Sequence, residues 1–122
     1  DKMPILSHGN VISQHKIEGI GDEFVPDLIN RSIIDNIILI NDDDSINMAK
    51  KLSSELGLGV GISSGANFLG TIIASQSIDK PIVTVFADDN KKYLSTDLFK
   101  NITTNKQFIS ENVKLISYEA IK

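Results

Sequence analysis

The sequence contains no cysteine and no tryptophan, and Arg31 is its only arginine. Without cysteine the chain cannot form disulfides, thiolate zinc sites or a thiol nucleophile. It has no run of 18 apolar residues, so no membrane span is predicted. Acidic residues outnumber basic ones by 16 to 12, and no segment concentrates lysine, so we expect no nucleic-acid partner.

What the sequence does contain is the composition of an ordinary globular domain. Of its 122 residues, 41% are hydrophobic and 23% are charged, which is enough for a buried core. The pattern divides the chain into an irregular loop segment, an α/β core and a tail. These parts are residues 1–32, 33–100 and 101–122.

The core alternates between strand-like and helix-like segments. Residues 36–40 and 81–86 are β-branched apolar runs typical of strands covered on both faces, and residues 113–118 alternate like a half-exposed strand. Residues 46–56 have apolar side chains at helical spacing, and a second helix opens near residue 63. Strands that alternate with helices predict an α/β fold with a mostly parallel sheet.

Three consecutive acids, at residues 42–44, raise the possibility of a calcium site. An EF-hand loop requires oxygen ligands at alternate positions and glycine at the sixth, but Ile46 and Asn47 stand there. We therefore expect a helix N-cap with additional acid in the first turn, and no metal site.

Glycines at positions 57, 59, 61 and 65 superficially resemble a dinucleotide-binding fingerprint. Ser64 occupies the place of the last glycine, and a helix rather than a strand precedes the run, so nucleotide binding is not predicted. Ser63 and Ser64 remain as a glycine-flanked pair of hydroxyls. They either cap the following helix or contact a ligand heteroatom. His8 and His15 have no ordered partners that would make a catalytic triad.

Three segments resemble successive motifs of the cysteine synthase family, in the family's order and spacing. They are residues 15–26 (HKIEGIGDEFVP), residues 61–66 (GISSGA) and residues 92–96 (KYLST). The family consists of pyridoxal-phosphate enzymes of fold type II, and it includes cystathionine β-synthases and cysteine desulfhydrases. The resemblance implies that residues 1–122 are the C-terminal portion of the large domain of such an enzyme, with three layers.

The resemblance also assigns roles to individual residues. Ser63 occupies the position of the serine that hydrogen-bonds the pyridine nitrogen of the cofactor. Gly19, Ile20, Gly21 and Asp22 match the segment that lines the substrate entrance. The family's Schiff-base lysine and phosphate-binding loop have no counterpart in this sequence, so we expect the fragment alone to be inactive.

Two departures from plain cysteine synthases bear on the activity. Asp22 and Glu23 replace small residues, as in cystathionine β-synthases and desulfhydrases, where acids could attract an ammonium group or position a water. They could equally be solvated loop charges. Asp88 is the second departure, and it is expected at the end of a strand, where ligands gather in open α/β sheets.

The expected activity of the parent protein is the synthesis of L-cysteine from O-acetylserine and sulfide. The alternatives are a cysteine desulfhydrase acting on cysteine, a cystathionine β-synthase-type lyase, or a non-catalytic α/β module that binds a ligand or partner. By resemblance we expect a cytoplasmic homodimer.

Overall fold

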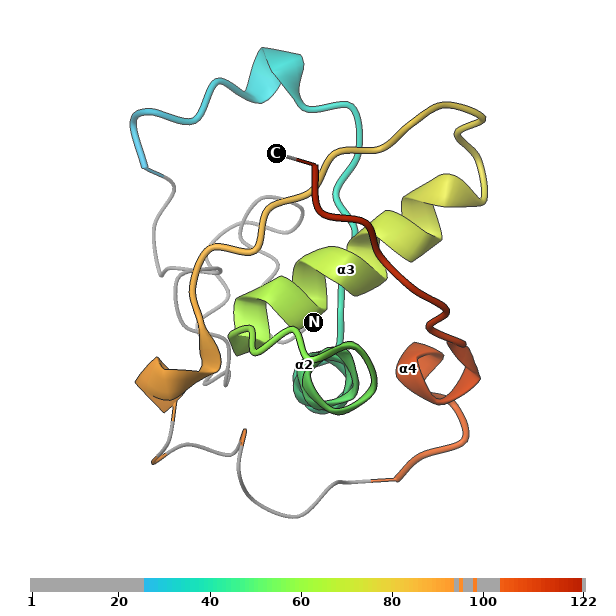
Figure 1. The fold of residues 1–122 in the computed structure, drawn as a ribbon. Helices are drawn as coiled ribbons and strands as arrows, with labels where there is room; N and C mark the ends of the chain where they lie inside the picture. Colours follow the sequence, from blue (N-terminus) through green and yellow to red (C-terminus); the bar gives the residue numbers. More distant parts are fainter. Residues whose placement is uncertain (1–25, 94, 96–97, 99–103, 122) are drawn as a thin grey trace.

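The computed structural model describes residues 26–93, 95, 98 and 104–121. Its two long helices are α2 (Asp42–Leu56) and α3 (Ile62–Ser75). The described residues also contain three single-turn elements, η1 (Arg31–Ile33), η2 (Asn90–Tyr93) and α4 (Ile109–Asn112). In Figure 1, α2 is seen down its axis, α3 crosses it, and α4 lies beside α2.

Helix α2 has clear signals at both ends. The Asn41 side chain accepts hydrogen bonds from the backbone N–H groups of Asp43 and Asp44, at 3.0 and 3.2 Å. Gly57 ends the helix with φ 71°, a conformation that a residue without a Cβ adopts at little cost. The predicted helix is thus confirmed. Its cap is Asn41, while the three acids form the first turn.

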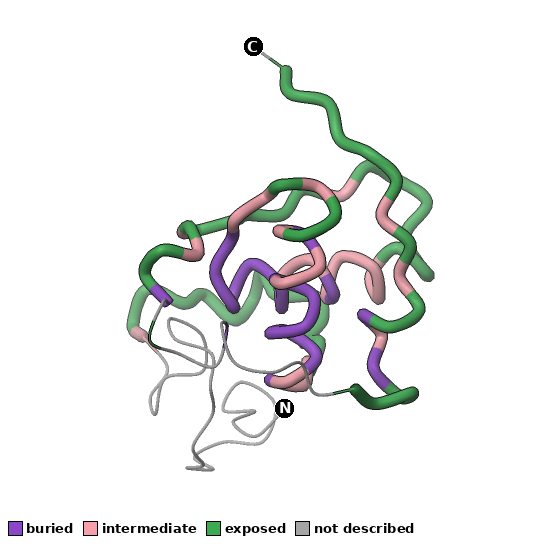
Figure 2. The backbone as a smooth tube through the Cα atoms, turned by 60° about the horizontal axis from the view of Figure 1, so that its bottom comes forward, coloured by how far each residue is buried: buried purple, intermediate pink, exposed green. Residues whose placement is uncertain are grey.

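The core lies between α2 and the first half of α3 (Figure 2). Met48 and Leu52 of α2 and Leu69 of α3 are fully buried, and burial of each such side chain contributes about 1.5–3 kcal/mol. The helices touch where Gly65 lies against Ser45, because a Cβ at Gly65 would meet the backbone carbonyl oxygen of Ser45. Gly65 of the GISSGA segment thus allows the two helix backbones to approach closely.

The single turn of α4 is held by two charged side chains of α2. The carboxylate of Asp44 accepts hydrogen bonds from the backbone N–H groups of Ile109 and Ser110, at 2.8 and 3.0 Å. The ammonium group of Lys51 donates to the backbone carbonyls of Ser110 and Val113. Side chains of α2 therefore satisfy the backbone groups at both ends of α4. The Asp44 carboxylate accepts from its first N–H groups, and the Lys51 ammonium group donates to its last carbonyls.

The predicted mostly parallel sheet is not present among the residues that the structure describes. Residues 36–40, 81–86 and 113–118 belong to no helix or strand, and an isolated antiparallel bridge between Val60 and Asp89 is recorded. The prediction of three strands is therefore wrong for this chain as it stands. An apolar run becomes a strand only when a neighbouring strand pairs its N–H and C=O groups and other layers cover its faces.

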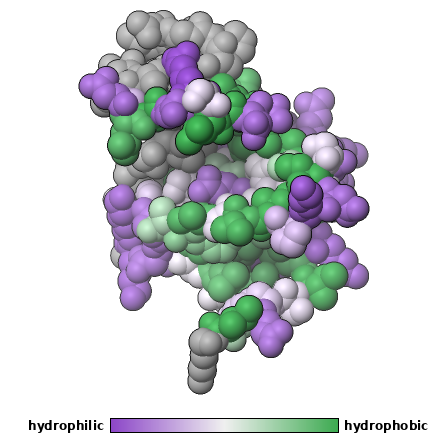
Figure 3. Space-filling model, turned by 90° about the horizontal axis from the view of Figure 1, so that it is seen from above, coloured by the Kyte–Doolittle hydropathy of each residue, from purple (hydrophilic) through white to green (hydrophobic). Residues whose placement is uncertain are grey.

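These segments instead leave apolar side chains in solvent. Val83 is 91% exposed and Ile116 is 85% exposed. Figure 3 shows hydrophobic side chains gathered across one face of the molecule. The described part contains no helix that is both long and apolar enough to cross a membrane.

Candidate functional site

The first turn of α3 presents two serine hydroxyls at the edge of the core. Ser63 is 8% exposed and Ser64 is fully buried. The hydroxyl of Ser64 has no hydrogen-bond partner, and none is recorded for the Ser63 hydroxyl among the described residues. Neither serine caps the helix, because the N-cap is Gly61, which has no side chain to do so. The capping interpretation of these serines is therefore wrong.

A second segment braces the residues that precede this turn. The backbone N–H of Gly61 donates to the carbonyl of Asp88, and the N–H of Asn90 donates to the carbonyl of Gly59, both at 3.0 Å. These two bonds surround the bridge between residues 60 and 89. Asp88 thus lies beside Gly61, which precedes Ser63 by two residues and is the N-cap of α3.

The side chain of Asp88 is tied to a buried aromatic ring. The hydroxyl of Tyr93 donates to Asp88 Oδ2 at 2.7 Å, and Lys92 Nζ lies 3.3 Å from the same oxygen. Asp88 Oδ1 is buried without a hydrogen-bond partner. No acid lies in the first turn of α3 itself, and the Asp88 carboxylate lies beside Gly61 at the positive end of the helix.

The cofactor implied by the resemblance fits this arrangement at one point. A pyridine nitrogen requires a group that can donate or accept a hydrogen bond, and a serine hydroxyl does either. The Ser63 hydroxyl is neutral, mostly buried and uncommitted to another described side chain. Ser63 could therefore hold the ring nitrogen without supplying a charge to it.

The other predicted site residues lie outside the described part of the chain. These are the substrate-entrance residues Gly19, Ile20, Gly21 and Asp22, together with Glu23 and both histidines. The structure therefore tests neither their proximity to Ser63 nor their contact with a substrate. Within the described ranges, no group of three His, Asp or Glu side chains could hold a metal ion.

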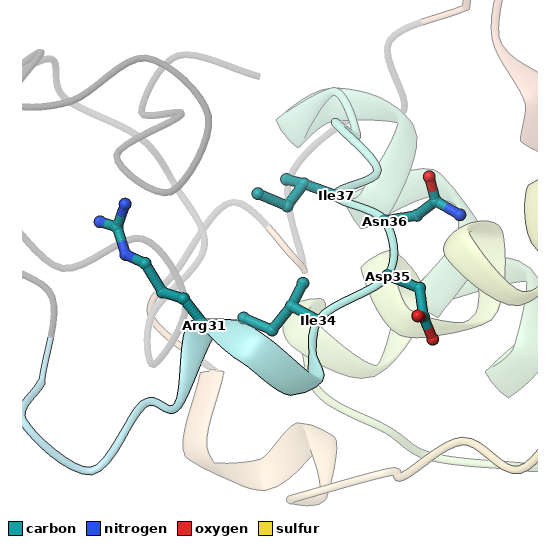
Figure 4. Close-up of a pocket in the computed structure, with 5 residues that line it drawn as sticks. All are labelled: Arg31, Ile34, Asp35, Asn36 and Ile37. Carbon is teal, nitrogen blue, oxygen red and sulfur yellow. The ribbon is translucent and has the colours of Figure 1, made fainter.

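Two hollows occur elsewhere on the described surface. One of about 280 Å³ lies beside η1 and is lined by Arg31, Ile34, Asp35, Asn36 and Ile37. Figure 4 shows Ile34 and Ile37 pointing to one side of the backbone and Asp35 and Asn36 to the other. A smaller one, of about 160 Å³, lies between α2 and Asn90. Neither is lined by Ser63 or by Asp88.

Sequence reasoning missed how Asp88 is used. The sequence predicts Asp88 at the end of a strand near a ligand, and the structure shows that it contacts Gly61 and Tyr93. A separation of five residues fits neither the helical nor the strand repeat, so it does not predict that Asp88 and Tyr93 are in contact. The sequence indicates only that both lie in or beside the KYLST motif.

Comparison with known proteins identifies close relatives of the chain. Cysteine synthase B of Campylobacter jejuni is 48% identical over 97 residues, which are 79% of this chain and 32% of that protein. No protein-family profile matches the sequence. The chain thus spans about a third of the length of its curated relatives.

Solved structures agree with the sequence relationship. A hydrogen sulfide-producing enzyme from Fusobacterium nucleatum is 50% identical, with a TM-score of 0.84 over 91% of this chain and 34% of that one. A mutant of such an enzyme, in complex with an α-aminoacrylate intermediate, matches with 49% identity and a TM-score of 0.84, over 90% of this chain and 33% of that one. The described helices and extended segments therefore follow the path of the corresponding third of these enzymes.

Proposed function

Because this chain belongs to the cysteine synthase family, we propose that it is the C-terminal part of a pyridoxal-phosphate enzyme that makes L-cysteine from O-acetylserine and sulfide. The observation that supports this most directly is the uncommitted Ser63 hydroxyl in the first turn of α3. In the parent protein we expect a three-layer α/β domain, in which residues 1–122 form the C-terminal portion, within a cytoplasmic homodimer.

Bound pyridoxal phosphate supplies an electron sink for breaking bonds at the substrate amino acid. The part of this chain in that chemistry is to hold the ring. Ser63 binds the pyridine nitrogen through a neutral hydroxyl, so the nitrogen stays largely unprotonated and the sink is kept weak. Burial of the turn keeps water away from this contact, which strengthens it. By resemblance, residues 19–21 would line the substrate entrance, where Gly19 and Gly21 would leave room for an amino-acid substrate.

The Ser63 assignment is tested by changing the charge beside the ring. In the protein expressed at the full length of its relatives, Ser63→Asp should protonate the pyridine nitrogen, alter the cofactor absorption band and slow turnover. Ser64→Ala is the matched control, because it removes a neighbouring buried hydroxyl that has no partner to lose. Unchanged absorption and turnover in Ser63→Asp would remove the support for the assignment.

A second candidate activity is release of sulfide from cysteine, by a desulfhydrase or a related cystathionine β-synthase-type lyase. It is favoured by the acids at positions 22 and 23 and by the 50% identity to an enzyme described as hydrogen sulfide-producing. The two candidates are separated by offering sulfide, homocysteine and water as acceptors and measuring each product.

The acids at the substrate entrance can be tested in the same assay. If Asp22 and Glu23 select the acceptor, Asp22→Asn with Glu23→Gln should shift the preference toward sulfide. Unchanged preference would identify both as solvated loop charges. A full-length protein that binds no pyridoxal phosphate would leave the non-catalytic binding module as the remaining candidate.

A further inference from the structure

We propose that Asp88 and Tyr93 are positioning residues for Ser63, and that they fix the orientation in which the cofactor ring is held. The proposal rests on the proposed function, since it concerns the same binding site. It assigns a role to two side chains that do not themselves touch the cofactor. Three contacts join residue 93 to the first turn of α3.

The first contact is the hydrogen bond within the pair. Tyr93 is 1% exposed, and its hydroxyl donates to Asp88 Oδ2 at 2.7 Å. A hydrogen bond to a carboxylate is short and stronger than a neutral one. Because the Tyr93 ring is held by the core, this bond limits the positions that the Asp88 carboxylate can take.

The second contact is between the pair and Gly61. A Cβ built on Gly61 would collide with Asp88 Oδ1 and would lie 2.6 Å from Tyr93 Cε2. The space beside Gly61 is therefore already filled by the two side chains. The backbone bond from Gly61 N–H to the Asp88 carbonyl, at 3.0 Å, holds the same residue from its amide side.

The third contact passes from Gly61 into the helix. Its carbonyl accepts hydrogen bonds from the N–H groups of Ser64 and Gly65, at 3.2 and 3.3 Å. These bonds close the turn that contains Ser63. Since α3 has no side-chain cap and no acid in its first turn, its beginning is fixed from outside by residues 88 and 93.

Lys92 provides a matched control within the same cluster. Its ammonium group contacts the same Asp88 oxygen at 3.3 Å, but its side chain is 60% exposed. A solvent-exposed ion pair contributes little, because water and salt screen it. Loss of the lysine should therefore affect Ser63 much less than loss of the tyrosine hydroxyl.

The experiment uses the protein expressed at the full length of its relatives and loaded with pyridoxal phosphate. Tyr93→Phe, Asp88→Asn and Lys92→Gln are each titrated with the cofactor, and the visible circular dichroism of the bound ring is recorded. We expect Tyr93→Phe and Asp88→Asn to weaken cofactor binding by about 3- to 10-fold and to change the dichroic band. Lys92→Gln should change binding by less than about 2-fold.

A double-mutant cycle with Ser63→Ala separates positioning from general destabilisation. If the pair acts through Ser63, Tyr93→Phe should weaken binding no further once the Ser63 hydroxyl is absent. Additive losses, or an unaltered dichroic band in both Tyr93→Phe and Asp88→Asn, would overturn the proposal. If the Ser63→Ala variant binds the cofactor as tightly as the unmodified protein does, that result would contradict the proposed function, and the positioning role with it.

Discussion

At the scale of single residues, glycine is required where another part of the chain fills the space of a side chain. Gly61 is such a position, because the Asp88 carboxylate and the Tyr93 ring lie where its Cβ would be. Gly70, in the same helix region, has no atom within 4 Å of a built Cβ. The two glycines look alike in the sequence, yet only one of them is demanded by packing.

Substitution by alanine should distinguish these two glycines. Gly61→Ala forces Asp88 or Tyr93 to move, and we expect it to lower the free energy of unfolding by about 1–3 kcal/mol. Gly70→Ala should raise it by about 0.5–1 kcal/mol, because alanine loses less backbone entropy in a helix. Urea denaturation measures both. Equal effects of the two changes would contradict the account of the Gly61 contact.

At the scale of elements, α4 exists because α2 holds it. A single helical turn is not stable by itself, since nucleation costs more than one hydrogen bond returns. Asp44, 3% exposed, binds its first N–H groups, and Lys51, two turns further along α2, binds its last carbonyls. The acid cluster therefore serves a structural contact between distant segments as well as the helix dipole.

Neutralising Asp44 tests this arrangement. Asp44→Asn keeps the side-chain shape but removes the charge and replaces one of the two acceptor oxygens with an NH2 group, so one of the two hydrogen bonds is lost and the other is weakened. We expect the free energy of unfolding to fall by about 1–3 kcal/mol and the amides of Ile109 and Ser110 to exchange faster. Glu111→Gln, an exposed acid within α4, is the control and should change stability by less than about 0.5 kcal/mol. Unchanged exchange at the two amides would show that Asp44 does not hold α4.

At the scale of the whole molecule, the described part of the fold is a pair of helices accompanied by extended segments that form no sheet with one another. Many of their apolar side chains are exposed, such as those of Val83 and Ile116, while Ile40, Val113 and Leu115 pack against the core. The relatives that share this sequence are about three times as long. We expect a covered sheet only in a protein of that length, and this expectation can be tested at a single position.

Val83 is a position at which a substitution should affect stability differently in this chain and in a protein of its relatives' length. Val83→Lys in this chain should change the free energy of unfolding by less than about 0.5 kcal/mol, because the side chain is 91% exposed. In the protein expressed at the length of its relatives, the same change should cost more than about 2 kcal/mol, since a covered strand would bury the charge. Asp79→Lys, in the exposed loop, is the control for both. A small effect of Val83→Lys in both proteins would refute a covered strand at residues 81–86.

The sequence by itself determined what depends on neighbouring residues. The helical spacing after residue 46, the glycine at 57 and the GISSGA segment placed both long helices and Ser63, because caps and helical faces arise from contacts within a few residues. The family resemblance also followed from local motifs, and close relatives confirm it.

Only the tertiary structure decided which distant groups meet. Asp44 binds amides 65 and 66 residues away, and residue 88 is brought to Gly61, with no periodic signal for either contact. The apolar runs likewise could not reveal whether they would be paired, because a strand requires hydrogen-bond partners that its own residues do not contain. Local chemistry thus established the helices and the candidate serine, while packing between remote segments established which residues lie beside Gly61, at the beginning of the helix that carries that serine.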